Sequence, residues 1–186
     1  IEIMAPVGSY ESLAAAIQAG ADSVYFGVGK LNMRSASAAN FTLDDLAKIV
    51  ATARAAGVKT YLTVNTIVYE DELRTVHEVI DRAKAEGIDA VIASDFAAIL
   101  YARRIGVEVH ISTQSNISNS EAVKFFSQWA DTVVLAHAAS YAAANTPSQT
   151  RRPARRWTWT AATYSRPRTS ARSIFSTSSS ARASGC

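Results

Sequence analysis

The chain has 186 residues, of which 48% are hydrophobic and 19% are charged, and its formal net charge is +3. This length suits one globular domain with a sizeable core, and no apolar run approaches the ~18 residues that a transmembrane helix requires. The single cysteine, Cys186, excludes an intrachain disulfide framework. We therefore expect no membrane partner and predict a cytoplasmic protein.

The distribution of charge divides the chain at Ala136. Residues 1–136 hold all 16 acidic groups and 11 basic ones, a net charge of −5, whereas residues 137–186 hold eight arginines and no acid, a net charge of +8. The second segment is rich in alanine, serine and threonine and lacks apolar periodicity, so it cannot bury enough surface to offset chain entropy. We predict a folded domain over 1–136 and an irregular or disordered basic tail over 137–186, with at most a short helix around 140–145.

Helical and extended segments alternate along the first part of the chain. The expected strands are short apolar runs bounded by glycine, proline or polar residues, and they cover residues 2–5, 22–26, 58–64, 89–93, 107–111 and 132–136. The expected helices show amphipathic spacing, and they cover residues 10–19, 42–56, 70–86, 96–104 and 121–128.

Apolar strands that alternate with helices indicate an α/β protein with a parallel sheet covered by helices. The chain lacks a glycine-rich dinucleotide fingerprint between a strand and a helix, which favours a barrel over a doubly wound sheet. The predicted fold is an incomplete (β/α)8 barrel of the TIM type, with about six β/α units.

Polar side chains gather where the expected strands end, most densely from Thr113 to Asn119 after the fifth strand. In barrels the carboxyl ends of the strands share one rim, and that rim carries the ligand site. The candidate substrate-binding residues at this rim are Arg34, Asn40, Asn65, Gln114 and Asn116.

The chemistry of these five residues suits a small polar anion, or an RNA base together with its phosphate. The guanidinium of Arg34 offers a planar fork for a carboxylate or phosphate. The amides of the other four can donate and accept hydrogen bonds without changing charge. A structural role remains open for each of them, because such side chains also cap helices and satisfy backbone groups at strand ends.

Catalytic residues are harder to assign. Asp95 and His110 are the candidate pair, although His110 could equally be a buried histidine of the core, facing either the barrel interior or the helices. No partner nucleophile, H-E-x-x-H or G-x-S-x-G motif is present. We therefore leave the catalytic residues unknown and expect no metal site.

Several segments of residues 1–136 resemble the collagenase-like peptidase family, numbered U-thirty-two. They read IMAPVGSYESLAAAIQAGADSVYFG, NMRS, NFTLDDL, GVKTYLTVNT, IDAVIASD and HISTQSNISN, in this order. The resemblance implies a TIM barrel and a peptidase, a hydrolase of collagenase-like activity. Members of the family also resemble oxygen-independent hydroxylases that modify tRNA or rRNA bases or a quinone ring, with an iron–sulfur cluster on four cysteines.

The resemblance stops after Ala136, where a cysteine-containing block would be expected to follow. We therefore expect an N-terminal, truncated part of the catalytic barrel that is inactive as this chain and holds no cofactor, because the cluster cysteines are absent. An out-of-frame gene end would explain the tail, and a natural disordered arm is the alternative.

Two partner predictions follow from the tail and from the missing strands. Arginines interleaved with Trp157, Trp159 and Tyr164 leave open a non-enzymatic, basic-tailed RNA-binding protein. A barrel that stops early leaves its first and sixth strands as open edges, which favours self-association.

Overall fold

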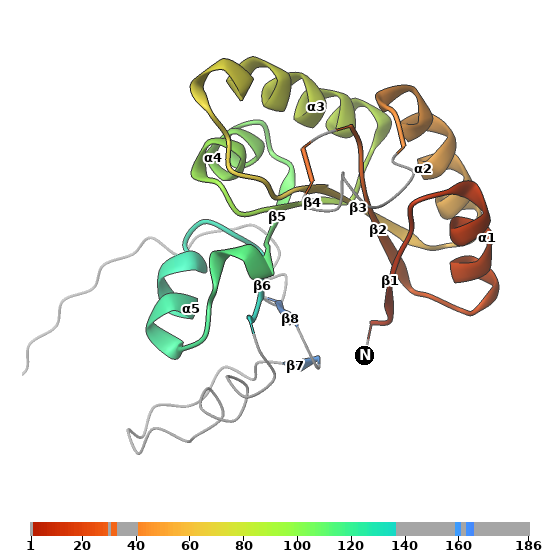
Figure 1. The fold of residues 1–186 in the computed structure, drawn as a ribbon. Helices are drawn as coiled ribbons and strands as arrows, with labels where there is room; N and C mark the ends of the chain where they lie inside the picture. The colour runs from red at the N-terminus through yellow and green to blue at the C-terminus, as the bar shows by residue number, and fades with distance from the viewer. Residues whose placement is uncertain (1, 30, 33–40, 137–158, 161–162, 166–186) are drawn as a thin grey trace, which may run out of the picture.

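The computed structural model describes residues 2–29, 31–32, 41–136, 159–160 and 163–165. Six parallel strands lie side by side in chain order and form a curved sheet (Figure 1). They are β1 (Met4–Pro6), β2 (Ser23–Gly27), β3 (Lys59–Val64), β4 (Ala90–Ala93), β5 (Glu108–Ile111) and β6 (Thr132–Val134). The predicted barrel of about six β/α units is confirmed as a half-barrel.

Helices α1 to α4 cover the outer side of this curved sheet (Figure 1). Each strand neighbours the next one along the chain, so right-handed crossovers all place their helices on the same side. The helices are α1 (Tyr10–Gln18), α2 (Leu46–Ala55), α3 (Leu73–Glu86), α4 (Phe96–Arg104) and α5 (Ser120–Phe126), with 3-10 turns η1 (Leu43–Asp45), η2 (Glu70–Glu72) and η3 (Thr113–Ser115). A doubly wound sheet would carry helices on both faces.

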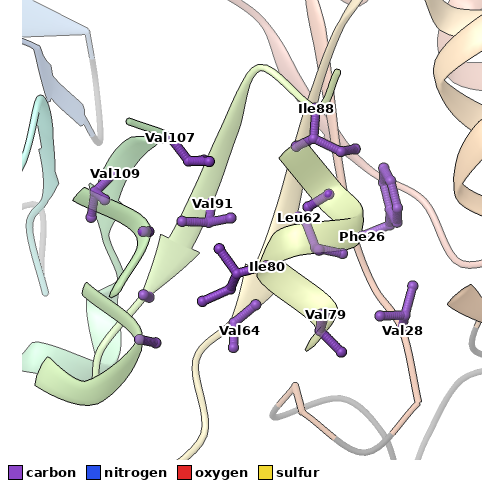
Figure 2. Close-up of a cluster of buried hydrophobic side chains, with 14 of the residues drawn as sticks. Phe26, Val28, Leu62, Val64, Val79, Ile80, Ile88, Val91, Val107 and Val109 are labelled. Carbon is purple, nitrogen blue, oxygen red and sulfur yellow. The ribbon is translucent and has the colours of Figure 1, made fainter. Parts of the chain in front are cut away.

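The hydrophobic core lies between the sheet and these helices (Figure 2). Successive side chains of a strand point to opposite faces, and most of the strand residues on the helix side are apolar and buried. These residues include Val24, Phe26, Leu62, Val64, Val91, Val109 and Ile111. Ile80 and Val79 of α3 pack onto the same core.

Three aspartates fix the register at the amino ends of the sheet in the same way. Asp22, Asp89 and Asp131 each precede an even-numbered strand, and each donates its backbone N–H to a carbonyl of the preceding strand or of the residue before it, at 2.9–3.0 Å. Each carboxylate accepts the N–H of that same residue, at 2.7, 2.8 and 3.1 Å. Alternate strand pairs are thus held by one repeated two-bond bridge.

The end of the chain differs from the sequence-based expectation. Strands β7 (Trp159–Thr160) and β8 (Thr163–Ser165) pair with each other, and β8 runs antiparallel to β6. The sixth strand is therefore not an open edge, because β8 pairs with its outer backbone N–H and C=O groups. The helix expected around 140–145 lies outside the described residues.

At the other side of the sheet, β1 pairs with β2 alone among the described residues. Self-association through open barrel edges stays a prediction, and it now rests on β1. Within the described part of the chain, no helix combines the length and the apolarity needed to cross a bilayer.

Candidate functional site

A cavity of about 630 Å³ opens on the inner face of the half-barrel, at the carboxyl ends of the strands. Its volume lies within the ~300–1,000 Å³ typical of small-molecule sites. Amides and hydroxyls form its polar lining, contributed by Asn32, Thr63, Asn65, Ser112, Thr113 and Gln114. Its apolar lining includes Met4, Val7, Tyr25, Phe26, Ile92 and Val134.

The structure brings together two of the predicted substrate-binding residues, Asn65 and Gln114. Asn65 follows β3, and its Nδ2 donates to the hydroxyl of Ser112 at 3.2 Å. The same hydroxyl accepts the backbone N–H of Gln114 at 3.3 Å. Because Ser112 is buried at the end of β5, it ties the two residues to one fixed corner of the cavity.

Asn32 lines the cavity although the prediction did not single it out among the binding residues. Its side chain is only 4% exposed, and Nδ2 donates to the carbonyl of Gly29 at 3.3 Å. The amide lies directly against the backbone of Gly27, where an added Cβ would stand 2.3 Å from Cγ of Asn32. The glycine that ends β2 is therefore the sequence signal for a side chain packed over the strand end.

Asn116, a third predicted binding residue, does not line the cavity. Asn116 ends η3 with φ of 51° and ψ of 38°, and its N–H donates to the carbonyl of Thr113 at 3.0 Å. Asparagine tolerates this left-handed conformation better than most residues. The backbone conformation therefore accounts for an asparagine at position 116 without a role in binding. Arg34 and Asn40 lie outside the described residues, and their binding roles stay predictions.

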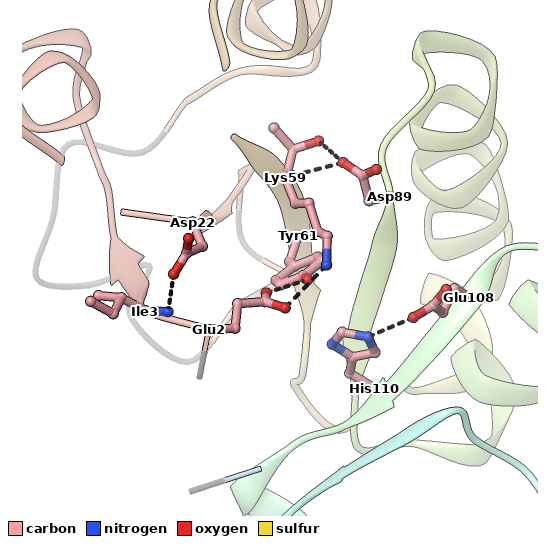
Figure 3. Close-up of polar contacts among 9 residues, drawn as sticks. Glu2, Ile3, Asp22, Lys59, Tyr61, Asp89, Glu108 and His110 are labelled. Carbon is pink, nitrogen blue, oxygen red and sulfur yellow. Dashed lines mark hydrogen bonds and ion pairs between the residues drawn. The ribbon is translucent and has the colours of Figure 1, made fainter. Parts of the chain in front are cut away.

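The two candidate catalytic residues have separate partners. Asp95 is the N-cap of α4: one carboxylate oxygen accepts the N–H of Ala97 at 2.8 Å, and the other accepts that of Val68 at 3.2 Å. His110 faces the barrel interior, with Nε2 3.2 Å from Oε1 of Glu108 (Figure 3). Neither lines the cavity, and their catalytic pairing stays a prediction.

Below the cavity, at the amino ends of the strands, the inner face carries a polar network (Figure 3). The ring of His110 meets Tyr61 edge-on at 4.7 Å between centroids. The hydroxyl of Tyr61 donates to Glu2 at 2.6 Å, and Lys59 Nζ contacts the same carboxylate at 3.1 Å. Burial and this bond raise the pKa of Tyr61.

The pKa of Glu2 is lowered, although the side chain is partly buried. Burial alone would raise the pKa of this carboxyl, but the hydrogen bonds from Tyr61 and Lys59 and the charge of Lys59 outweigh burial and lower the pKa below its ordinary 4.5. The network therefore holds a carboxylate at the end of the half-barrel opposite the cavity.

The described residues do not suit a metal ion or an iron–sulfur cluster. They contain no group of three histidine, cysteine, aspartate or glutamate side chains placed to hold a metal. The one cysteine of the chain, Cys186, lies outside them, and a cluster requires several thiolates. The absence of a cofactor from this chain stays a prediction.

Comparison with known proteins identifies the family of this chain. The family model described as peptidase family U32 matches residues 8–147. The chain belongs to peptidase family U32. The match includes most of the residues that line the cavity, and it confirms the resemblance read from the sequence.

Relatives of this U32 protein carry two kinds of name. A collagenase of Porphyromonas gingivalis is 63% identical over 135 residues, which cover 73% of this chain and 33% of the relative. A tRNA hydroxylation protein of Bacillus subtilis is 34% identical over 142 residues, 75% of this chain and 33% of the relative. A 23S rRNA 5-hydroxycytidine synthase of Escherichia coli is 36% identical over 127 residues, 68% of this chain and 19% of the relative. The chain spans about a third or less of the length of these relatives.

Solved structures agree on the fold. A U32 peptidase matches with a TM-score of 0.65 at 15% identity, covering 80% of this chain and 65% of that structure. Deoxyribose phosphate aldolase of Aeropyrum pernix matches with a TM-score of 0.54 at 16% identity, covering 72% of this chain and 63% of that structure. At such identities the likeness shows the fold alone.

Proposed function

We propose that this chain forms the substrate-binding wall of a collagenase-like peptidase and that its cavity holds a short stretch of extended peptide. The observation that carries the proposal is the 63% identity to a collagenase. The chemistry of the cavity supports it, because every polar side chain in its described lining is a neutral amide or hydroxyl. Such groups pair with peptide N–H and C=O groups without a charge to compensate.

The cavity has a place for each part of a peptide. Asn65 and Gln114 at the fixed corner beside Ser112 suit the backbone, while Tyr25 and Ile92 offer apolar surface for side chains. No carboxylate, imidazole or thiol belongs to the described lining. The groups that would cleave the peptide bond are therefore proposed to lie in the part of the relatives that this chain does not span.

A second candidate is the binding of an RNA base for hydroxylation. The same lack of a carboxylate, imidazole or thiol in the described lining favours it, as do the names of two relatives. Amide side chains recognise the edges of bases, and an aromatic ring such as Tyr25 stacks on their faces. Peptide binding and base binding would thus use the same residues.

A titration of the purified chain separates the two candidates. The probes are a glycine- and proline-rich peptide and the nucleotides cytidine and uridine monophosphate, with binding followed by NMR. We expect the peptide to bind and Asn65→Ala to weaken it about tenfold, as the loss of one well-placed hydrogen bond would. Gln128→Ala removes an exposed amide outside the cavity and should change nothing.

Two other outcomes contradict the proposal in different ways. Binding of a nucleotide but not of the peptide, with the same loss in Asn65→Ala, supports the base-binding candidate instead. Equal binding by Asn65→Ala and the parent chain means that the cavity is not the site of either ligand.

A further inference from the structure

A second cavity, of about 400 Å³, lies at the opposite end of the sheet from the first. It sits where α3 and α4 end and where β4, β5 and β6 begin. Its charged lining consists of Lys84, Asp89, Arg103, Glu108 and Asp131. The cavity thus collects both signs of charge within one small volume.

The two cations of this second cavity are available to a ligand. Lys84 Nζ donates to the carbonyl of Ile105 at 2.6 Å, which holds the ammonium at the rim and leaves two of its three hydrogens. Arg103 has no side-chain partner among the residues that the structure describes. By contrast, the guanidinium of Arg54, at the end of α2, is engaged by the carbonyl of Gly87 at 3.0 Å.

Two of the carboxylates, those of Asp89 and Asp131, accept hydrogen bonds from the described residues through only one of their two oxygens. Asp89 and Asp131 each use Oδ2 to bridge two strands at the amino ends of the sheet, so the position of each side chain is fixed. Their other oxygens, Oδ1, make no hydrogen bond within the described structure. These two residues therefore present rigidly held acceptors to the cavity.

We propose that this second cavity binds a small zwitterion, an amino acid or a short peptide with free ends. Its carboxylate pairs with the planar fork of Arg103 and with Lys84, and its ammonium group with either Asp89 or Asp131. The volume falls within the range of small-molecule sites. None of the residues of this site lines the first cavity, so the inference does not depend on the proposed function.

Simpler ligands fit the charges less well. An inorganic dianion would meet three carboxylates against two cations. A divalent cation would lie beside Lys84 and Arg103, and no described group of three acidic or histidine side chains is placed to hold it. Only a ligand with both charges satisfies both sides of the cavity.

The test is a titration of the full chain with glycylglycine, followed through the backbone amide signals of Gly106 and Val107, which also line the cavity. We expect saturable shifts that weaken at high salt. Acetylation and amidation of the two ends should abolish them, because both charges are then lost. Arg103→Gln should weaken binding about fivefold, the ratio expected from one solvent-exposed ion pair.

Arg104→Gln is the matched control. Its guanidinium packs over the ring of Tyr101, at 4.8 Å from the centroid, and does not line the cavity. This variant should therefore bind glycylglycine like the parent chain. The inference is overturned by equal losses in the two variants, by equal shifts with the capped peptide, or by the absence of saturable shifts.

Discussion

The same strands of this half-barrel present two unlike faces. On the outer face, residues such as Leu62, Val91 and Ile111 are completely buried beneath helices. On the inner face, the alternate positions hold Tyr61 and His110, with polar groups above and below them. The period of two along each strand separates a packing surface from a chemical one.

The two faces obey different constraints. The outer face requires apolar volume, since close packing against the helices supplies most of its stabilisation. The inner face borders a cavity at one end and a polar network at the other. The chemistry of each of its side chains therefore has to suit its particular contacts. Substitutions on the two faces should therefore differ in kind as well as in size.

The largest change in stability is expected when an isoleucine is shortened to alanine, and it should differ between the two faces. Ile111→Ala opens a void in a fully buried site, and we expect the free energy of unfolding to fall by about 2–5 kcal/mol. Ile92→Ala, on the inner face, enlarges a cavity that is already open and should cost about half as much or less. Urea denaturation of both variants measures the difference, and equal losses would contradict the contrast between the faces.

A smaller effect is expected where β2 meets the cavity. Gly27→Ala places a Cβ 2.3 Å from Cγ of Asn32, and overpacking of this kind costs about 1–3 kcal/mol. Because Cβ of Asn32 would also stand 2.6 Å from the added Cβ, the double variant that removes the clash is Gly27→Ala/Asn32→Gly, and its loss should be clearly smaller than the sum of the single losses. Additive losses would mean that the amide does not rest on the glycine.

The fold was predictable because its signals are local and repeated. Ser9 and Asn119 cap α1 and α5, and their side-chain oxygens accept N–H groups at the third residue of each helix. α4 has the expected bounds, Phe96–Arg104. Strands β7 and β8 were missed because the segment that holds them has no periodicity, and their pairing depends on the edge that β6 offers.

The site was predictable only in part, because a polar residue near a strand end can serve the backbone or a ligand. Asn65 and Gln114 do line the cavity. Asp95 and Asn116 follow the same pattern, yet one caps a helix and the other adopts a left-handed turn. Counting back two residues from Asn65 would have found Thr63 on the inner face.

The turn at Asn116 offers a test of that distinction, with an effect of about 1 kcal/mol. Asn116→Ala places a residue with a Cβ and no local hydrogen-bonding group in the left-handed region, which costs roughly 1 kcal/mol. Asn116→Gly should keep the stability of the parent chain within about 0.5 kcal/mol and should leave ligand binding unchanged. Lost binding in a fully stable Asn116→Gly variant would instead restore the predicted binding role.

The smallest effect is expected at the amino end of the inner face, and it should depend on pH. Because folding lowers the pKa of Glu2 below its ordinary 4.5, the charged carboxylate stabilises the fold above that pH, and this contribution disappears as the pH falls through the folded value. Tyr61→Phe keeps the ring but removes the hydroxyl that donates to Glu2, so we expect a loss below about 1 kcal/mol at pH 7, since Glu2 is partly exposed. Stability measured from pH 7 to pH 3 should show this loss shrinking below pH 4.5, whereas Tyr69→Phe, at an exposed ring, should show no such trend. A loss that is constant with pH would mean that Tyr61 stabilises the inner face through packing alone.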